Sequence, residues 1–81
     1  MYDLTGFQRD VLYVIGGNDG PKGVEIKEDL DGYYEKDVNH GRLYPNLDKL
    51  VEKGLVEKGK IDDRTNQYTL TKRGNRELAA R

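Results

Sequence analysis

Apolar residues return every three or four positions along the start of the chain, which is the spacing of an amphipathic helix. Thr5 and Gln8 form the pattern of a capping box and mark where this helix begins. The run 16–23 is rich in glycine, contains a proline and ends the helix, and residues 22–24 are expected to be briefly extended. The apolar members of the helix are Phe7, Val11, Leu12, Val14 and Ile15.

A second helix is predicted from about residue 24 to residue 34. Ile26 and Leu30 are expected on its inner face, together with one of two adjacent tyrosines, Tyr33 or Tyr34. Residues 35–37 are polar and typical of a turn. The outer face of this helix is acidic, and its members are Glu25, Glu28, Asp29 and Asp31.

A third helical segment, about 39–53, separates its side chains onto three faces on a wheel of about 100° per residue. One stripe is apolar and consists of Leu43, Leu47 and Leu50. A second stripe, about 90° away on the same wheel, is Arg42, Asn46, Lys49 and Lys53. The carboxylates of this segment, Asp48 and Glu52, fall far from both stripes. The polar stripe is therefore predicted to offer guanidinium, amide and ammonium groups with no acid among them.

Local signals set the ends of this third helix. Asn39 is a favourable N-cap, and Gly54 is expected to supply the left-handed C-cap. Pro45 lies beyond the first helical position, so one backbone hydrogen bond is lost there. A bend or a loosened first turn is expected at 41–45, without a break in the helix.

The remaining residues predict a hairpin and a final helix. Residues 55–61 are typical of a strand, 62–66 of a hairpin tip, and 67–70 of the returning strand. Thr71 is expected to cap a last helix from Lys72 to about Ala80, with Leu78 and Ala79 as its apolar members. This order of elements is that of a winged helix-turn-helix, in which the hairpin is the wing. We therefore predict a mostly helical α+β fold and one domain over residues 1–81.

Charge is distributed unevenly along the chain. The net charge of the 81 residues is −1, but residues 1–41 hold 4 basic and 9 acidic side chains, whereas residues 42–81 hold 10 basic and 6 acidic ones. This asymmetry indicates one surface that faces a polyanion and another that is turned away from it. Chance segregation on a highly charged surface is the alternative interpretation.

The composition argues against several classes of function. The chain has no cysteine, no serine and one histidine, which disfavours disulfides, a metal site and nucleophilic catalysis. No phosphate-binding glycine motif is present, so we expect no enzyme activity and no cofactor. No apolar run is long enough to span a membrane or resembles a signal peptide. A cytoplasmic protein is expected.

Two motifs resemble those of the PadR family of transcriptional regulators. The first is residues 39–47, which contain Leu43-Tyr44-Pro45, followed by a leucine run that ends in Lys53-Gly54-Leu55. The second is residues 68–74, which match the family's pattern Tyr-x-Leu-Thr-x-x-Gly at the exit from the wing. The resemblance covers nearly the whole chain and implies a dimeric DNA-binding regulator, most often a repressor. The family usually carries a long C-terminal helix or bundle for dimerisation, whereas this sequence stops at Arg81, so a short form without that domain is expected. A homodimer is then expected to use the first and last helices and the tyrosines near Tyr2.

The candidate DNA contacts lie on the third helix and the wing. Arg42 and Asn46 are near the start of the predicted recognition helix, where arginine suits guanine and asparagine suits adenine. His40 either contacts a phosphate or stacks on Tyr44, and Tyr44 either reaches a phosphate or packs beside Val51 against the wing. On the wing, Arg64 is favoured over Lys60, and Asp62 and Asp63 either oppose DNA or set the turn. The complete set is Asn39, His40, Arg42, Tyr44, Asn46, Lys49, Lys53, Lys60 and Arg64.

Two functions remain open from the sequence. The first is a sequence-specific repressor that binds double-stranded DNA and represses by occluding a promoter. Helix 39–53 would lie in the major groove, and the wing, 55–70, on the backbone or in the minor groove. The second is a winged-helix module that binds another protein through its acidic second helix. No small-molecule ligand site is identifiable from the sequence.

Overall fold

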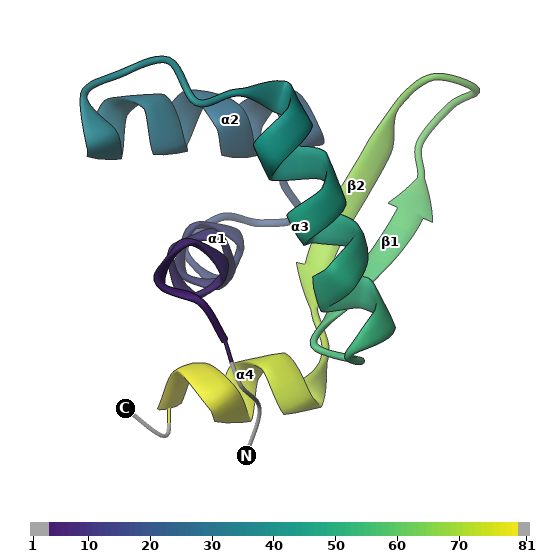
Figure 1. Cartoon of the computed structure of the whole chain (residues 1–81). Helices are drawn as coiled ribbons and strands as arrows, with labels where there is room; N and C mark the ends of the chain where they lie inside the picture. The colour runs from purple at the N-terminus through teal and green to yellow at the C-terminus, as the bar shows by residue number, and fades with distance from the viewer. Residues whose placement is uncertain (1–3, 80–81) are drawn as a thin grey trace.

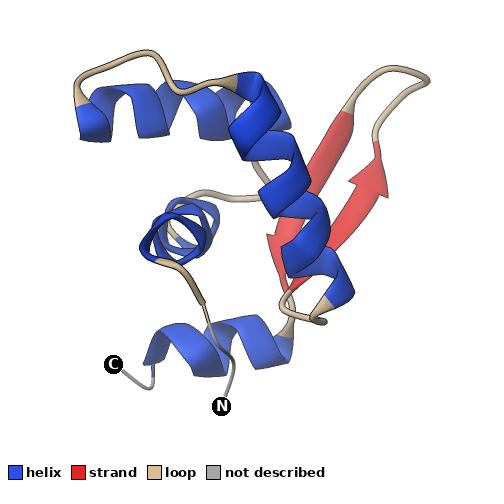
Figure 2. Cartoon of the chain, in the orientation of Figure 1, coloured by secondary structure: helices blue, strands red, loops and turns tan. Residues whose placement is uncertain are grey.

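The computed structural model describes residues 4–79 and contains four helices and a two-stranded hairpin. The elements are α1 (Gly6–Gly16), α2 (Gly23–Tyr34), α3 (His40–Glu52), β1 (Val56–Lys60), β2 (Asn66–Leu70) and α4 (Lys72–Ala79). In Figure 1, α2 and α4 lie on opposite sides of α1, and α3 lies beside the hairpin. Figure 2 shows that both strands lie at one side of the helices. The mostly helical winged helix-turn-helix that the sequence predicts is therefore confirmed.

Helix α1 begins at a full capping box, whereas at the start of α2 only the Glu25 carboxylate accepts, from the Lys22 N–H at 2.8 Å. The Thr5 hydroxyl accepts from the Gln8 N–H at 3.1 Å, and the Gln8 side chain accepts from the Thr5 N–H at 3.2 Å, as the sequence predicts. The prediction of an extended piece at 22–24 is wrong beyond its first residue, because α2 already begins at Gly23. Lys22 itself is extended and forms an antiparallel bridge with Gln67. The segment before α2 is thereby attached to the hairpin.

Helix α3 runs unbroken through Pro45. The Asn39 side chain accepts from the Gly41 N–H at 2.6 Å, which confirms the predicted N-cap. At the other end, Gly54 has a φ of +77°, a value that residues with a side chain rarely adopt. The Leu55 N–H then donates to the Leu50 carbonyl and the Gly54 N–H donates to the Val51 carbonyl, which are the two bonds of a Schellman motif. This turn sends the chain directly into β1.

The hairpin pairs β1 and β2 antiparallel, with Val56 opposite Leu70 and Lys60 opposite Asn66. Both predicted strands need a correction at their ends: β1 is shorter than residues 55–61, and β2 begins one residue earlier than predicted. The Ile61 N–H donates to the Thr65 carbonyl at 2.9 Å and closes the tip. Most of β1 is exposed, whereas Tyr68 of β2 is buried.

Helix α4 is joined to the wing by one threonine. The Thr71 hydroxyl donates to the Gly54 carbonyl at 2.7 Å and accepts from the Gly74 N–H at 3.0 Å, so it caps α4 as predicted. Leu78 packs on the core from its partly buried position, which gives α4 the inner face that its sequence only weakly indicated. The expected extension of this helix to Ala80 falls outside the described residues.

One hydrophobic core unites the elements. Of the adjacent tyrosines, Tyr34 packs against this core, whereas Tyr33 is 67% exposed. Val24, an apolar residue of the first turn of α2, is exposed as well. Within residues 4–79, no helix is long and apolar enough to cross a membrane. The buried apolar residues are Phe7, Val11, Leu12, Ile15, Ile26, Leu30, Val38, Leu43, Leu47, Leu50, Leu55, Val56 and Tyr68.

The contact between Tyr34 and Asp10 predicts a specific loss of stability in alkali. Burial and the hydrogen bond that the hydroxyl donates to Asp10 raise the pKa of Tyr34 to about 12, above the value of about 10 expected for an unfolded chain. A raised pKa means that stability is complete below pH 10 and is lost as the pH rises through about 12. We expect Tyr34→Phe to remove this part of the pH dependence. Urea unfolding of both proteins at pH 8 to 11 measures the free energy of unfolding at each pH. If this free energy fell equally with pH in the wild type and in Tyr34→Phe, the prediction would be contradicted.

Candidate nucleic-acid interface

The turn between α2 and α3 is fixed by side chains of α2. Asp31 accepts from the Val38 N–H at 2.7 Å and from Lys27 at 2.8 Å, and Lys27 also donates to Asp37 at 2.7 Å. Because the Lys27 ammonium and the Val38 N–H stabilise the carboxylate, the pKa of Asp31 is lowered. Glu35 ends α2 in the left-handed conformation, with a φ of +56°. These contacts set the position at which α3 begins.

The polar stripe predicted on α3 is only partly open to solvent. Lys49 is exposed, whereas Asn46 and Lys53 are half-buried against α1. Gln8 is 4% exposed and donates to the Asn46 Oδ1 at 2.9 Å, and the Asn46 Nδ2 donates to the Arg42 carbonyl at 2.7 Å. The Lys53 Nζ lies 3.5 Å from the Gln8 Oε1. The sequence predicted that all four side chains of this stripe would be open to solvent. This prediction is wrong for Asn46 and Lys53, because α1 packs beside this side of α3.

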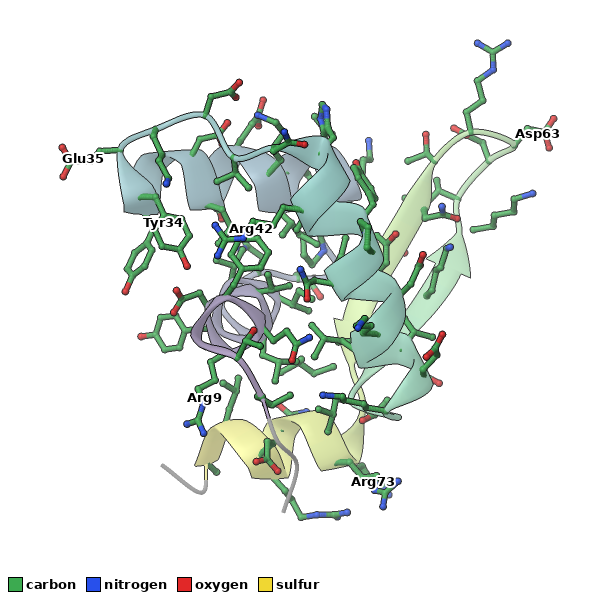
Figure 3. All side chains as sticks on the ribbon, in the orientation of Figure 1. Arg9, Tyr34, Glu35, Arg42, Asp63 and Arg73 are labelled. Atoms are coloured by element: carbon green, nitrogen blue, oxygen red, sulfur yellow. The ribbon has the colours of Figure 1, made fainter. Side chains whose placement is uncertain are left out.

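Arg42 also turns toward α1 but stays exposed. Its Cζ lies 4.0 Å from the centre of the Phe7 ring, a cation–π contact. Figure 3 shows Arg42 extending from α3 toward α1, on the same side as Tyr34. Phe7 and Tyr34 are stacked, with ring centres 6.2 Å apart and an angle of 20° between the planes.

His40 and Tyr44 form a second ring contact at the start of α3. Their ring centres lie 5.7 Å apart with an angle of 37° between the planes, so the stacking alternative for His40 is present. Tyr44 packs beside Gly23 at the start of α2, where an added Cβ would lie 2.7 Å from the hydroxyl oxygen. That hydroxyl therefore lies at the start of α2, a position that the sequence did not indicate. Asn39, the N-cap, is exposed beside these rings.

The wing carries exposed cations and an acidic tip. Lys60 and Arg64 are both exposed. The Asp62 carboxylate accepts from the Arg64 N–H at 2.9 Å, and this bond is the main cause of its lowered pKa. Asp62 thus sets the turn, one of the two roles foreseen for it, and Asp63 lies at the tip in Figure 3. An ion pair of 3.7 Å between Lys58 and Asp48 links β1 to α3.

The start of α3 and the wing meet in one cleft of 160 Å³. Tyr44 contributes to it from α3 and Arg64 from the wing. Lys22, which forms the bridge to Gln67 of β2, lines the same cleft. Lys22 was not among the sequence-derived candidates, because its proximity depends on that bridge. The full lining is Lys22, Gly23, Val24, Tyr44, Arg64, Thr65, Asn66 and Tyr68.

A second concave region lies on α1 and α2. It has a volume of 360 Å³ and is lined by Arg9, Asp10, Tyr13, Val14 and Tyr33. Tyr13 and Tyr33 are each 67% exposed, so neither belongs to the core. Tyr2, also expected in a dimer surface, lies outside the described residues. Within residues 4–79, no three acidic or histidine side chains are grouped so that they would hold a metal ion.

Comparison with known sequences gives a family for most of the chain. The family model described as "Transcriptional regulator PadR-like family" matches residues 11–80. Among curated protein sequences, no significant match is found.

Comparison with solved structures gives the same fold. RosR of H. salinarum is 52% identical, with a TM-score of 0.92, and the match covers 96% of this chain and 70% of RosR. MarR of E. coli is 32% identical, with a TM-score of 0.81, and the match covers 96% of this chain and 55% of MarR. FabT of Streptococcus pneumoniae in complex with DNA is 22% identical, with a TM-score of 0.80, and the match covers 96% of this chain and 52% of FabT. The likeness to FabT shows a shared fold.

Proposed function

The chain belongs to the PadR-like family of transcriptional regulators, and from this premise we propose that it is a sequence-specific DNA-binding repressor that occludes a promoter. The family is one of transcriptional regulators, which also makes an enzyme the less favoured interpretation. FabT, which shares the fold, has been solved in complex with DNA, and this supports duplex DNA as the partner.

One observation carries the proposal: Tyr44 of α3 and Arg64 of the wing line a common cleft, together with Lys22. A recognition helix contacts base edges chiefly through its N-terminal residues, and a neighbouring wing can then contact the adjacent backbone or minor groove. His40, Tyr44 and Asn39 lie at that end of α3, and Lys60 and Arg64 lie on the wing. In this arrangement they would contact phosphate or sugar and fix the position of the domain on DNA.

The remaining proposed contacts lie further along α3. Arg42 and Lys49 are exposed and are the candidates for guanine or phosphate. Asn46 uses one donor and one acceptor within the protein, which leaves one of each for an adenine edge. Lys53 lies beside Gln8 near the end of α3, where a contact with a phosphate is the more suitable role.

We propose further that the protein acts as a homodimer on paired half-sites about one helical turn apart. The exposed Tyr13 and Tyr33, with the concave region beside them, support this proposal, because large exposed aromatic side chains are common in protein interfaces. The second candidate function is binding to another protein through α2. The acidic outer face of that helix, with Glu28 and Asp29 exposed, is the observation that favours it.

A fluorescence-anisotropy titration tests the function directly. We expect the protein to bind DNA that flanks its own gene more tightly than random DNA, with two protomers per site. Binding to the flanking DNA should weaken steeply between about 50 and 200 mM salt, because each phosphate contact releases counterions. Equal weak binding to both DNAs would argue against sequence-specific regulation at that site. No binding at either salt concentration would favour the protein-binding module.

A further inference from the structure

Phe7 lies where α1 passes beneath a side chain of the proposed DNA-binding surface. It is 5% exposed, and the face of its ring lies 4.0 Å from the Arg42 Cζ. A guanidinium above an aromatic face is attracted by the ring quadrupole and can stack on the ring plane. Arg42 is itself exposed, so this contact orients the side chain without burying it.

The Phe7 ring also packs against a second aromatic ring. Tyr34 of α2 stacks on it with ring centres 6.2 Å apart, and the Tyr34 hydroxyl donates to Asp10 of α1. Tyr33 in turn packs edge-on against Tyr34 at 5.1 Å. The series Asp10–Tyr34–Phe7–Arg42 therefore joins three helices into one stack that ends at the start of α3. A buried ring that packs against Tyr34 gives the Arg42 guanidinium a defined position to contact.

The hydrogen-bonding groups of Arg42 stay available in this arrangement. Among residues 4–79, no acidic side chain forms an ion pair with Arg42. A ring contact uses the face of the guanidinium and leaves its N–H donors, which lie in the plane, free to reach a base edge or a phosphate. Holding a long side chain in one conformation before binding reduces the entropy lost when DNA binds.

We propose that Phe7 is a positioning residue that orients Arg42 for DNA. This inference rests on the proposed DNA-binding function. Phe7 touches no DNA in this account and acts through Arg42 alone. This role was not predictable from the sequence, where Phe7 is one of several apolar residues of the first helix.

A double-mutant cycle in DNA binding tests the proposal. Phe7→Leu keeps an apolar side chain but removes the aromatic face. With Arg42 present, we expect it to weaken binding to the preferred DNA by about 5-fold, the effect of a cation–π contact of roughly 1 kcal/mol. In an Arg42→Ala background, the same substitution should change affinity by less than about 2-fold. Equal losses in both backgrounds would show a general structural effect and overturn the proposal.

A second measurement uses the wild-type protein alone and therefore does not depend on whether a variant folds. In the free wild-type protein, the Arg42 side-chain protons should be shifted upfield in the NMR spectrum by the Phe7 ring, and the Nε–H group should be ordered. Arg42 side-chain chemical shifts equal to those of a freely rotating arginine would overturn the proposal. If the wild-type protein shows no preference between DNAs, the proposed function fails instead. If it binds specifically but Phe7→Leu has no effect, only the positioning role of Phe7 fails.

Discussion

Replacing Gly74 with alanine should destabilise the protein more than any other single addition of a methyl group. An added Cβ would lie 2.1 Å from the Leu55 carbonyl oxygen, which belongs to the backbone and cannot rotate away. That oxygen also accepts from the Thr71 N–H at 3.0 Å, so a shift would break the joint between α4 and the hairpin. We expect a loss of about 3 kcal/mol in the free energy of unfolding, the upper end of the usual range for overpacking. Urea unfolding followed by circular dichroism measures it.

Gly32→Ala is the matched control for this substitution. Gly32 lies within α2, and nothing is within 4 Å of the position that its Cβ would take. Because alanine favours the helical backbone, the same chemical change there should stabilise the protein by about 0.5 to 1 kcal/mol. If Gly74→Ala cost no more than Gly32→Ala, the close packing between α4 and Leu55 would not exist in solution.

Replacing Arg42 and Lys49 together with alanine should produce the largest loss of DNA binding. Both side chains are exposed on α3, and each is proposed to contact a base or a phosphate. We expect affinity for the preferred DNA to fall on the order of 100-fold, since a lost arginine–base contact alone costs about 1 to 3 kcal/mol. The slope of log affinity against log salt should also decrease by about 0.9 for each phosphate contact that is lost. Anisotropy titrations at several salt concentrations measure both quantities.

The control removes one charge elsewhere. Lys36 after α2 is exposed and lines neither the cleft beside α3 nor the concave region proposed for the dimer. Lys36→Ala should leave specific binding nearly unchanged. If it weakened binding as much as Lys49→Ala alone, binding would depend on total charge and the proposed surface would be wrong. If the double variant of Arg42 and Lys49 lost no affinity, the recognition helix would not be the element that contacts DNA.

The elements themselves were predictable because their signals are local. The capping box of Thr5 and Gln8, the Asn39 cap and the left-handed Gly54 each depend on residues at most a few positions apart. Leucine spacing similarly identified the buried face of α3, since helical periodicity alone places Leu43, Leu47 and Leu50 together. The errors lie at element ends, where β1 and β2 differ from prediction by a residue, and at Gly23, where α2 begins sooner than expected.

The surroundings of the polar stripe were not predictable in the same way. A helical wheel separates Asn46 and Lys53 from the leucines, but it contains no information about which other helix lies beside them. Gln8 was predicted as a capping residue and has that role, yet it is also buried and bonded to Asn46, 38 residues away. Likewise, Lys22 and Arg64 come together on one cleft only because the segment before α2 pairs with β2.

The winged helix-turn-helix, its caps and its buried leucine stripe were thus predictable from the order of residues, because short-range hydrogen bonding and periodic burial act within each element. Which polar groups of α3 stay exposed depends instead on how the helices pack against one another. Packing of α1 occupies Asn46 with Gln8 and places the Phe7 ring beneath Arg42, while Lys49 remains exposed. Those contacts join residues more than thirty positions apart, and chain folding alone brings them together.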